Sequence, residues 1–277
     1  MPRIPEFLFL DSRFLFLDMN DIKYKGAKIH FSAVGDGDKI PLILLHGFLE
    51  DSLIWKPMLE VLQKDRQVIC IDLPGHGRSE GVSEVHSMDL MAEVVKKILE
   101  HLKIESVSLA GHSMGGYVGL ELLKNFPMLL KSILLINSTP IEDSVEKKKI
   151  RDRSINLVGK NMEAFISMAI SNLYTVESKV KFASEIQNLK NRAINMEPGN
   201  VQAALAGMKI RPNYLEELKA FPGQKIIVAG KQDPILDNDE LAKIAQKCNC
   251  EFHLMEKGHN SYMEDMNNLR TIMHFID

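Results

Sequence analysis

The stretch from Ser108 to Tyr117 constrains the fold of this chain more than any other part of the sequence. It reads Ser-Leu-Ala-Gly-His-Ser-Met-Gly-Gly-Tyr, in which an apolar strand-like segment leads into Gly111-x-Ser113-x-Gly115 and an amphipathic helix up to about Asn125. In such an elbow the turn is so tight that the positions two before and two after the serine must lack a side chain. The elbow lifts the serine hydroxyl clear of its surroundings, as a nucleophile requires. We therefore expect Ser113 to be a catalytic nucleophile.

Composition and charge restrict the class of partner. The 277 residues are 45% hydrophobic and carry a net charge of -3, with acidic and basic residues interspersed. This length suits one large α/β domain with an inserted subdomain, and the mixed charges give no basic stripe for nucleic acid and no polybasic membrane patch. The cysteines Cys70, Cys248 and Cys250 lack zinc-type spacing. We expect a cytoplasmic protein that acts on a small molecule without a metal or other cofactor, and the sequence leaves its oligomeric state open.

The first eighteen residues contain a short repeat, because Phe-Leu-Phe-Leu-Asp occurs at 7–11 and again at 14–18. Asp11 interrupts the apolar core that a signal peptide needs, and no small-residue cleavage site follows. Two interpretations remain, a short extra strand or surface anchor and an extension that the fold does not use. We favour the second, with Met19 as the natural start of residues 19–140, the first part of the core.

Strand and helix signals alternate along most of the chain. An alternating pattern around a Lys-Gly turn at 22–34 predicts an edge hairpin, and fully apolar runs at 41–45, 68–71 and 133–136 are typical of strands covered on both faces. Helical periodicity fills the segments between these runs. Such alternation predicts a mostly parallel, doubly wound sheet with helices on both sides, formed by residues 19–140 and 211–277.

Residues 141–210 break this alternation and predict an all-helical insertion. Helical patterns cover 145–158, 162–173, 178–193 and 201–208, with no strand signal between them. A helical block inserted between two strands lies at the edge of the sheet or over its carboxyl ends, where ligands bind, so we expect a lid. The predicted pocket residues come from the lid and the core: Trp55, Tyr117, Phe165, Met168 and Tyr174. The basic run at 147–153 is expected to lie on a solvated helix face.

Two loops near the C-terminus supply the candidate partners of Ser113. Asp233 follows directly after an apolar strand at 225–230, where a carboxylate is well placed to orient a histidine at the carboxyl edge of the sheet. His259 follows the last predicted strand and is the best base among the nine histidines. Glu142 and Asp143 follow the preceding strand and remain alternatives for the acid. The order serine, aspartate, histidine matches this type of elbow.

Three other histidines lie close to these motifs and are expected to play other roles. His112 adjoins Ser113, but the elbow turns consecutive side chains apart. His76 lies in a turn between glycines, where a hydrogen bond to the backbone is the simplest role. His46 is expected to brace the loop that follows the strand at 41–45.

Five motifs in a fixed order are similar to those of the α/β-hydrolase family: Leu44-Leu45-His46-Gly47-Phe48, Asp72-Leu73-Pro74-Gly75-His76-Gly77-Arg78-Ser79, Gly111-His112-Ser113-Met114-Gly115-Gly116, Gly230-Lys231-Gln232-Asp233 and Gly258-His259. The resemblance runs from about Ile22 to the C-terminus and is weakest in the lid. It implies Ser113 as nucleophile, His259 as base and then acid, and Asp233 as the residue that orients His259. It also implies an oxyanion hole from the backbone amides of Phe48 and Met114.

The resemblance implies two-step acyl transfer on a small, largely apolar carboxylic ester. Members with an aspartate nucleophile, the dehalogenases and epoxide hydrolases, are disfavoured by Ser113. Two alternatives remain open. One is the pyruvate-eliminating synthase of the menaquinone pathway, whose elbow helix carries an arginine where this chain has Tyr117. The other is a lid-bearing receptor that hydrolyses its ligand slowly.

Overall fold

The computed structural model describes residues 18–274 and 276. Within these residues eight strands form one sheet in the order β1-β2-β4-β3-β5-β6-β7-β8. The strands β1 and β4 pair antiparallel to β2, and all other neighbours are parallel. The predicted α/β class with a mostly parallel sheet is confirmed. The strands are β1 (Asp18–Tyr24), β2 (Ala27–Val34), β3 (Leu42–Leu45), β4 (Val68–Ile71), β5 (Val107–His112), β6 (Leu130–Ile136), β7 (Gln224–Gly230) and β8 (Glu251–Met255).

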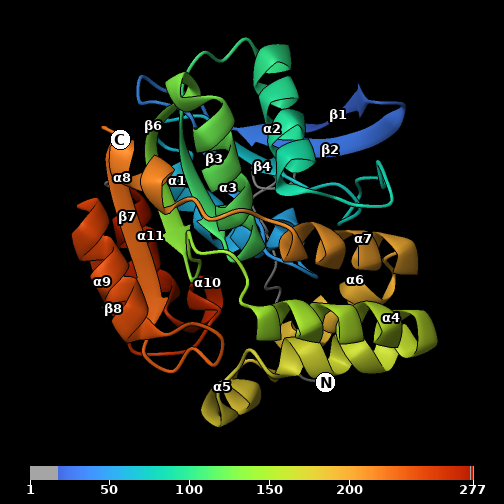
Figure 1. The fold of residues 1–277 in the computed structure, drawn as a ribbon. Helices are drawn as coiled ribbons and strands as arrows, with labels where there is room; N and C mark the ends of the chain where they lie inside the picture. The colour runs from blue at the N-terminus through green and yellow to red at the C-terminus, as the bar shows by residue number, and fades with distance from the viewer. Residues whose placement is uncertain (1–17, 275, 277) are drawn as a thin grey trace, which may run out of the picture.

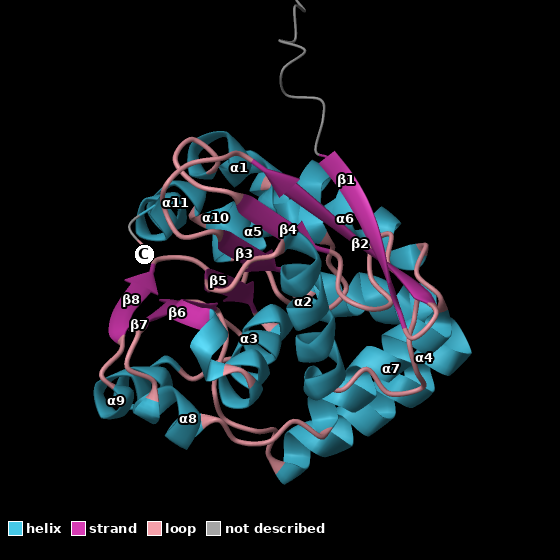
Figure 2. Cartoon of the chain, turned by 90° about the horizontal axis from the view of Figure 1, so that it is seen from above, coloured by secondary structure: helices cyan, strands magenta, loops and turns pink. Residues whose placement is uncertain are grey.

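Helices cover both faces of the sheet, as Figure 2 shows from above. In β3, Leu42 and Leu44 face α1 and α11, whereas Ile43 and Leu45 pack in the cluster that contains α2 and α3. Side chains of successive strand residues point to opposite faces, and burial of both faces explains why the central strands are apolar throughout. The helices of the core are η2 (Ser52–Trp55), α1 (Lys56–Leu62), α2 (Met88–Leu102), α3 (Met114–Asn125), η3 (Pro127–Leu129), α8 (Leu215–Ala220), α9 (Asn238–Cys248), α10 (Ser261–Glu264) and α11 (Met266–His274).

The edge hairpin is longer than the sequence pattern predicts. The strand β1 begins at Asp18, which pairs with Ala33, whereas the pattern placed the start of the sheet at Ile22. The turn lies at Lys25 and Gly26, both with positive φ, as the Lys-Gly signal predicts. The prediction that the N-terminal extension is outside the fold concerns residues outside the described part, except that Asp18 belongs to β1.

A chain that starts at Met19 is expected to keep its activity. The deletion removes from the described structure only the pairing of Asp18 with Ala33. Loss of this pairing is expected to lower the free energy of unfolding by about 1 kcal/mol, which lowers Tm by about 2–4 °C for a domain of this size. Thermal unfolding and ester hydrolysis measure this. A control that starts at Gly26 loses the whole of β1, including the buried Ile22, and is expected to lose far more stability. A large loss in the chain starting at Met19 would contradict the prediction.

The insertion between β6 and β7 is helical. Its helices are α4 (Val145–Ser171), α5 (Val176–Lys181), α6 (Ala183–Ile194) and α7 (Pro198–Lys209). The long α4 is interrupted at Asn161, where φ is -157° and ψ is 84°, close to the predicted gap between two helices. The single helix predicted at 178–193 is broken at Phe182 into α5 and α6. Figure 1 shows α4, α6 and α7 as a block beside the sheet, with α5 at the lower tip.

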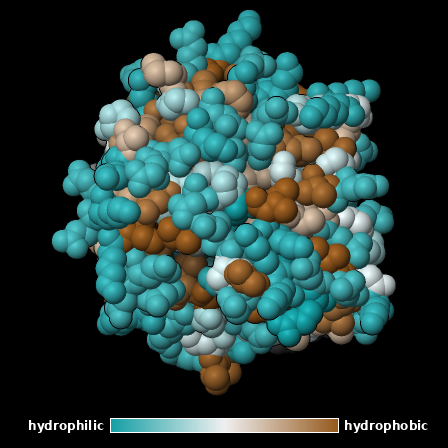
Figure 3. Space-filling view, viewed as in Figure 1, coloured by the Kyte–Doolittle hydropathy of each residue, from teal (hydrophilic) through white to brown (hydrophobic). Residues whose placement is uncertain are grey.

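On the side of the molecule that Figure 1 shows, the surface is mostly hydrophilic, with hydrophobic side chains in separate groups (Figure 3). One group lies at the lower tip, where Figure 1 places α5. There Val176 and Val180 are 81% and 78% exposed. Among the described residues, no helix combines the length and the apolar character that crossing a membrane requires.

Candidate active site

The elbow between β5 and α3 presents Ser113 in a strained conformation. Ser113 has φ 49° and ψ -111°, which few residues other than glycine adopt. A Cβ on Gly111 would lie 2.5 Å from the backbone of Gly115, and a Cβ on Gly115 would lie 2.4 Å from the carbonyl oxygen of Leu45 in β3. The close approach of these chains therefore requires glycine at both positions. The helix α3 begins at Met114, directly after the serine, and ends at Asn125, as predicted.

Ser113, His259 and Asp233 form one chain of hydrogen bonds. The hydroxyl of Ser113 lies 3.0 Å from Nε2 of His259, and Nδ1 of His259 lies 2.7 Å from Oδ2 of Asp233. The three residues follow β5, β8 and β7, whose carboxyl ends meet at one edge of the parallel sheet. An ionised Asp233 accepts from Nδ1, which leaves Nε2 unprotonated and able to accept the proton of Ser113.

The surroundings of Asp233 keep this carboxylate ionised. Burial raises its pKa, but the charge of His259 and the hydrogen bond from His259 lower it, as do the N–H groups of Ile235 and Leu236. These amides donate to Oδ1 at 2.8 and 3.2 Å. The net result is a pKa below the ordinary range, so Asp233 is an acceptor for His259 at neutral pH.

Asp143, the alternative acid, pairs with two arginine side chains. It forms ion pairs with Arg151 of α4 at 2.5 Å and with Arg211, which follows α7, at 2.8 Å. Burial raises the pKa of Asp143, yet these two guanidinium groups bring it below the ordinary range. The structure therefore favours Asp233 over Asp143 as the partner of His259.

Asn137 joins the loops of the acid and the base, and the sequence analysis missed it. It follows β6 with φ 46°, and its Nδ2 donates to Asp233 Oδ2 and to the carbonyl oxygen of Gly258, both at 3.2 Å. The strand β6 lies between β5 and β7 in the sheet. A polar residue directly after a buried strand at this position was the signal that could have identified it.

Two backbone amides lie free beside the serine. Met114 is the first residue of α3, where an N–H group has no partner within the helix, and Phe48 lies in the loop after β3. In the described part of the chain neither N–H donates a hydrogen bond. Both are therefore available for an oxyanion, although this role stays a prediction.

Two other histidines, His46 and His76, form hydrogen bonds with the backbone of nearby loops. His46 Nε2 accepts from the N–H of Leu73 at 3.0 Å, and its Nδ1 donates to the carbonyl oxygen of Gly47 at 2.8 Å. His46 thus ties the loop after β3 to the loop after β4. His76 Nδ1 donates to the carbonyl oxygen of Pro74 at 3.1 Å, the backbone contact that the sequence analysis expects.

A cavity of about 370 Å³ contains Ser113 and His259 and is bounded by both the core and the insertion. Of the predicted pocket residues, it is lined by Tyr117, Phe165 and Met168, together with Phe48, Leu205, Met208 and Ile235. This volume lies in the range of small-molecule sites. Because α4 and α7 contribute to its wall, the insertion covers the edge of the sheet at which Ser113 emerges.

Two predicted pocket residues, Trp55 and Tyr174, do not line this cavity. Trp55 is fully buried on the α1 and α11 side of the sheet, with its ring centroid 6.1 Å from that of Tyr262. Tyr174 is 4% exposed and packs in the large apolar cluster. Both predictions were wrong for the same reason: the rings pack into the interior, Trp55 from η2 and Tyr174 from the connection between α4 and α5.

Arg151 is a further correction, because it lines the cavity instead of facing solvent. It pairs with Asp143, which also pairs with Arg211, and the guanidinium of Arg211 stacks over the ring of Tyr117 at 4.0 Å. Lys147, Lys149 and Arg153 of the same helix are exposed, as predicted. A helix turns its successive side chains in different directions, so one member of a basic run can face inward.

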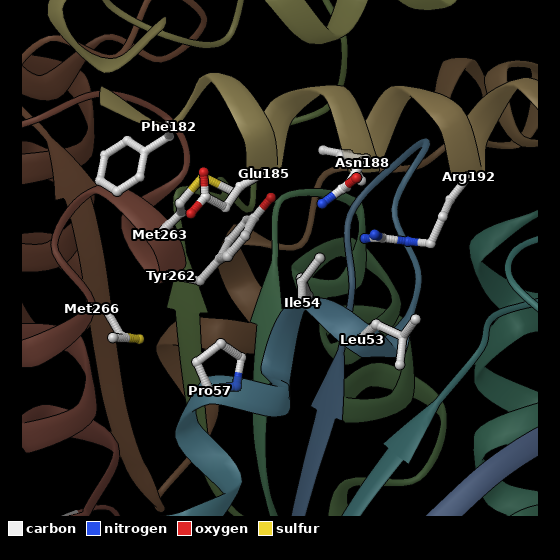
Figure 4. Close-up of a pocket in the computed structure, with 11 residues that line it drawn as sticks. Leu53, Ile54, Pro57, Phe182, Glu185, Asn188, Arg192, Tyr262, Met263 and Met266 are labelled. Carbon is white, nitrogen blue, oxygen red and sulfur yellow. The ribbon is translucent and has the colours of Figure 1, made fainter. Parts of the chain in front are cut away.

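A second cavity, of about 290 Å³, lies between α6, η2 and the start of α11 (Figure 4). Its walls include Leu53, Phe182, Tyr262 and Met266. None of Ser113, Asp233 and His259 lines this cavity, so it does not contain the candidate nucleophile. Among the described residues, no group of three or more histidine, cysteine, aspartate or glutamate side chains could hold a metal ion.

The sheet order, the serine on the elbow after β5 and the covering helices define a class of protein, the α/β hydrolases. The family model for the alpha/beta hydrolase fold matches residues 40–266. The chain belongs to this family and is an enzyme of this class.

Relatives along most of the chain include esterases. A pimeloyl-acyl-carrier-protein methyl ester esterase of Legionella pneumophila is 27% identical over 90% of this chain and 93% of its own. A thermophilic esterase of Thermogutta terrifontis, solved with malate bound, is 26% identical, has a TM-score of 0.84 and aligns over 92% of this chain and 96% of its own.

Other relatives match over shorter stretches. The dihydrolipoyllysine-residue acetyltransferase component of the acetoin cleaving system of Pseudomonas putida is 32% identical over 53% of this chain. This chain spans only 36% of that protein, and between 33% and 47% of three further curated relatives.

Proposed function

We propose that this protein is a serine hydrolase that cleaves a small, largely apolar carboxylic ester. The observation that carries the proposal is the chain of hydrogen bonds from Ser113 through His259 to Asp233. Acyl transfer by a serine requires a hydroxyl, a base and an orienting carboxylate linked in this order. The esterases among the relatives support the same reaction type.

In the proposed mechanism, Ser113 attacks the ester carbonyl while Nε2 of His259 takes its proton. The oxyanion that forms is bound by the amides of Phe48 and Met114, at the positive end of α3. His259 then donates the proton to the leaving alcohol. Water, deprotonated by His259, attacks the acyl-enzyme, and His259 returns this proton to the Ser113 oxygen as the bond to the acyl group breaks and the acid leaves. Asp233 holds His259 in one tautomer and stabilises its charged form during both steps.

The cavity supports an apolar substrate. Phe48, Phe165, Met168 and Leu205 contribute apolar walls around Ser113. Arg151 also faces the cavity, but its guanidinium is held at 2.5 Å by Asp143, which also pairs with Arg211, so a substrate carboxylate would have to compete with Asp143 for it. Burying a substrate carboxylate without a free partner would cost several kcal/mol in effective terms. The insertion then acts as the lid that closes this cavity.

The wild type is expected to prefer an uncharged short-chain ester over its ω-carboxylate analogue of equal length by at least about tenfold in kcat/KM, which corresponds to about 1.4 kcal/mol. The preference is measured with p-nitrophenyl esters of increasing acyl length and their ω-carboxylate analogues. Arg151→Met is the matched variant. Arg151→Met is expected to retain the preference. A wild type that prefers the charged ester, and loses that preference in Arg151→Met, would contradict the apolar pocket.

One observation keeps the pyruvate-eliminating synthase as a second candidate, namely that Arg151 lines the cavity. Tyr117 stands where that enzyme has an arginine, which speaks against it. An elimination substrate assayed beside the esters separates the two. Turnover that is slow for every substrate would favour the receptor alternative. The proposal also includes a cytoplasmic location without a cofactor, in keeping with the three free cysteines.

A further inference from the structure

A buried ion pair lies directly behind the candidate active site. Glu50 follows the Gly47-Phe48 loop, and His112 is the last residue of β5, directly before Ser113. His112 Nδ1 lies 2.8 Å from Glu50 Oε2, and the two side chains are 1% and 2% exposed. The ring of His112 lies 5.3 Å from that of His259, between centroids. Neither side chain has a role in the proposed acyl transfer.

His112 has acceptors on both sides, which settles its charge. Its Nδ1 faces the Glu50 carboxylate, and its Nε2 lies 3.0 Å from the carbonyl oxygen of His259. A neutral imidazole carries one N–H group, whereas these two contacts need two. With Glu50 ionised, His112 is therefore an imidazolium. Burial lowers the pKa of His112, but the charge and hydrogen bond of Glu50 outweigh burial and raise it.

Glu50 joins this imidazolium to the loop after β3. Its Oε2 accepts from the N–H of Gly47 at 2.6 Å as well as from His112, and its Oε1 accepts from the hydroxyl of Tyr262 at 3.1 Å. Burial raises the pKa of Glu50, while the charge of His112 and the hydrogen bonds from His112 and from the N–H of Gly47 bring it below the ordinary range. A Cβ on Gly47 would lie 2.7 Å from Glu50 Oε2 and 2.8 Å from His112 Nδ1. The loop therefore packs directly on the ion pair.

We propose that the Glu50–His112 ion pair positions the oxyanion loop and the catalytic histidine relative to Ser113. Through Gly47 it holds the loop that carries the Phe48 amide, and through the carbonyl oxygen it holds the backbone of His259. With Glu50 ionised, both contacts at once require a proton on each ring nitrogen of His112. Glu50 and His112 are thus positioning residues, and their role rests on the proposed acyl transfer at Ser113.

Replacement of Glu50 by glutamine tests this role, because one atom of Glu50 accepts from two donors. An amide oxygen at the Oε2 position keeps both donors only if His112 is protonated at Nδ1, which leaves its Nε2 lone pair facing the carbonyl of His259. An amide nitrogen there can donate to Nδ1 but opposes the N–H of Gly47. In either case one of the two links is lost, although the side chain keeps its shape.

Glu50→Gln is expected to lower kcat for ester hydrolysis 10- to 100-fold, in the range of a misplaced oxyanion donor, with KM changed less than about threefold. The kcat is referred to folded enzyme, measured by near-ultraviolet circular dichroism. Tyr262→Phe is the matched control: it removes the donor to Oε1 but keeps both links through Oε2, and it keeps the ring that lines the second cavity (Figure 4). It is expected to retain kcat within about threefold. Glu50→Asp, which retains the charge, is expected to lie between the two.

A spectroscopic readout separates this proposal from the proposed function. The ¹⁵N resonances of the His112 ring report its protonation without any substrate. In the wild type both ring nitrogens are expected to carry protons at about pH 7, above the ordinary histidine pKa of about 6.5, because the charges of Glu50 and Asp233 both raise the pKa of this ring. In Glu50→Gln only one nitrogen is expected to be protonated.

The outcomes are distinct. A neutral His112 in the wild type at that pH would overturn the proposal, even if Glu50→Gln failed to fold. So would wild-type kcat in Glu50→Gln, or an equal loss in Tyr262→Phe. A wild type that hydrolyses no ester would remove the proposed function, and the resonances would still show whether the charged pair exists.

Discussion

Replacement of Ser113 by alanine is expected to lower kcat for ester hydrolysis by about 10⁶-fold, the size of effect known for a serine of this kind. The hydroxyl of Ser113 is the only group of the hydrogen-bonded chain that forms a covalent bond in the proposed mechanism. Alanine takes the same backbone position, so the strain at φ 49° remains. The free energy of unfolding is therefore expected to change by no more than about 1 kcal/mol.

The assay combines hydrolysis of p-nitrophenyl esters with labelling by a fluorophosphonate probe, and both signals are expected to disappear in Ser113→Ala. Ser108→Ala is the matched control, because Ser108 lies on β5, the strand that leads to Ser113, is fully buried, and has a hydroxyl without a hydrogen-bond partner in the described structure. This control is expected to label as the wild type does. Labelling that persisted in Ser113→Ala would place the nucleophile elsewhere.

Asp233→Asn is expected to lower kcat by about 10⁴-fold, as in a serine protease triad. Asparagine keeps the shape of aspartate, but its amide offers a donor as well as an acceptor and so favours the wrong tautomer of His259. The wild-type contact of 2.7 Å between Nδ1 and Oδ2 would then be lost or reversed. The N–H groups of Ile235 and Leu236 donate to Oδ1 and favour the amide oxygen at that position, which places the amide nitrogen at the Oδ2 position, facing Nδ1.

Two carboxyl variants serve as controls for Asp233→Asn. Glu142→Gln is expected to retain both kcat and Tm. Asp143→Asn is expected to retain kcat within about tenfold but to lower Tm, because it leaves the buried Arg211 and its neighbour Arg151 without a counter-ion and breaking such a pair costs a few kcal/mol. Equal kcat in all three variants would remove Asp233 from its proposed role.

The sequence by itself determined the features that depend on local sterics and on strand order. Gly111 and Gly115 flank Ser113 because a Cβ at either position would meet backbone within about 2.5 Å. The five residues of this motif are therefore enough to predict the elbow. Asp233 and His259 each follow an apolar strand, and parallel strands bring their carboxyl ends to one edge. The order of these motifs was therefore enough to predict which side chains meet.

Only the tertiary structure decided which way individual side chains face. Trp55 and Tyr174 were predicted in the pocket and lie in the interior, whereas Arg151 was predicted in solvent and lines the cavity. A helical pattern gives the period of a helix but not its rotation against a neighbour, which is set by packing between segments far apart in the chain.

The same limit applies to contacts between loops. Glu50 lies 62 positions before His112 in the sequence, and their pairing depends on β3 and β5 being neighbours in the sheet. Asn137 meets Asp233 and Gly258 for the equivalent reason, because β6 lies beside β7. Local sequence specifies each strand and turn, but hydrogen bonds between loops exist only once the sheet has set the distances between them.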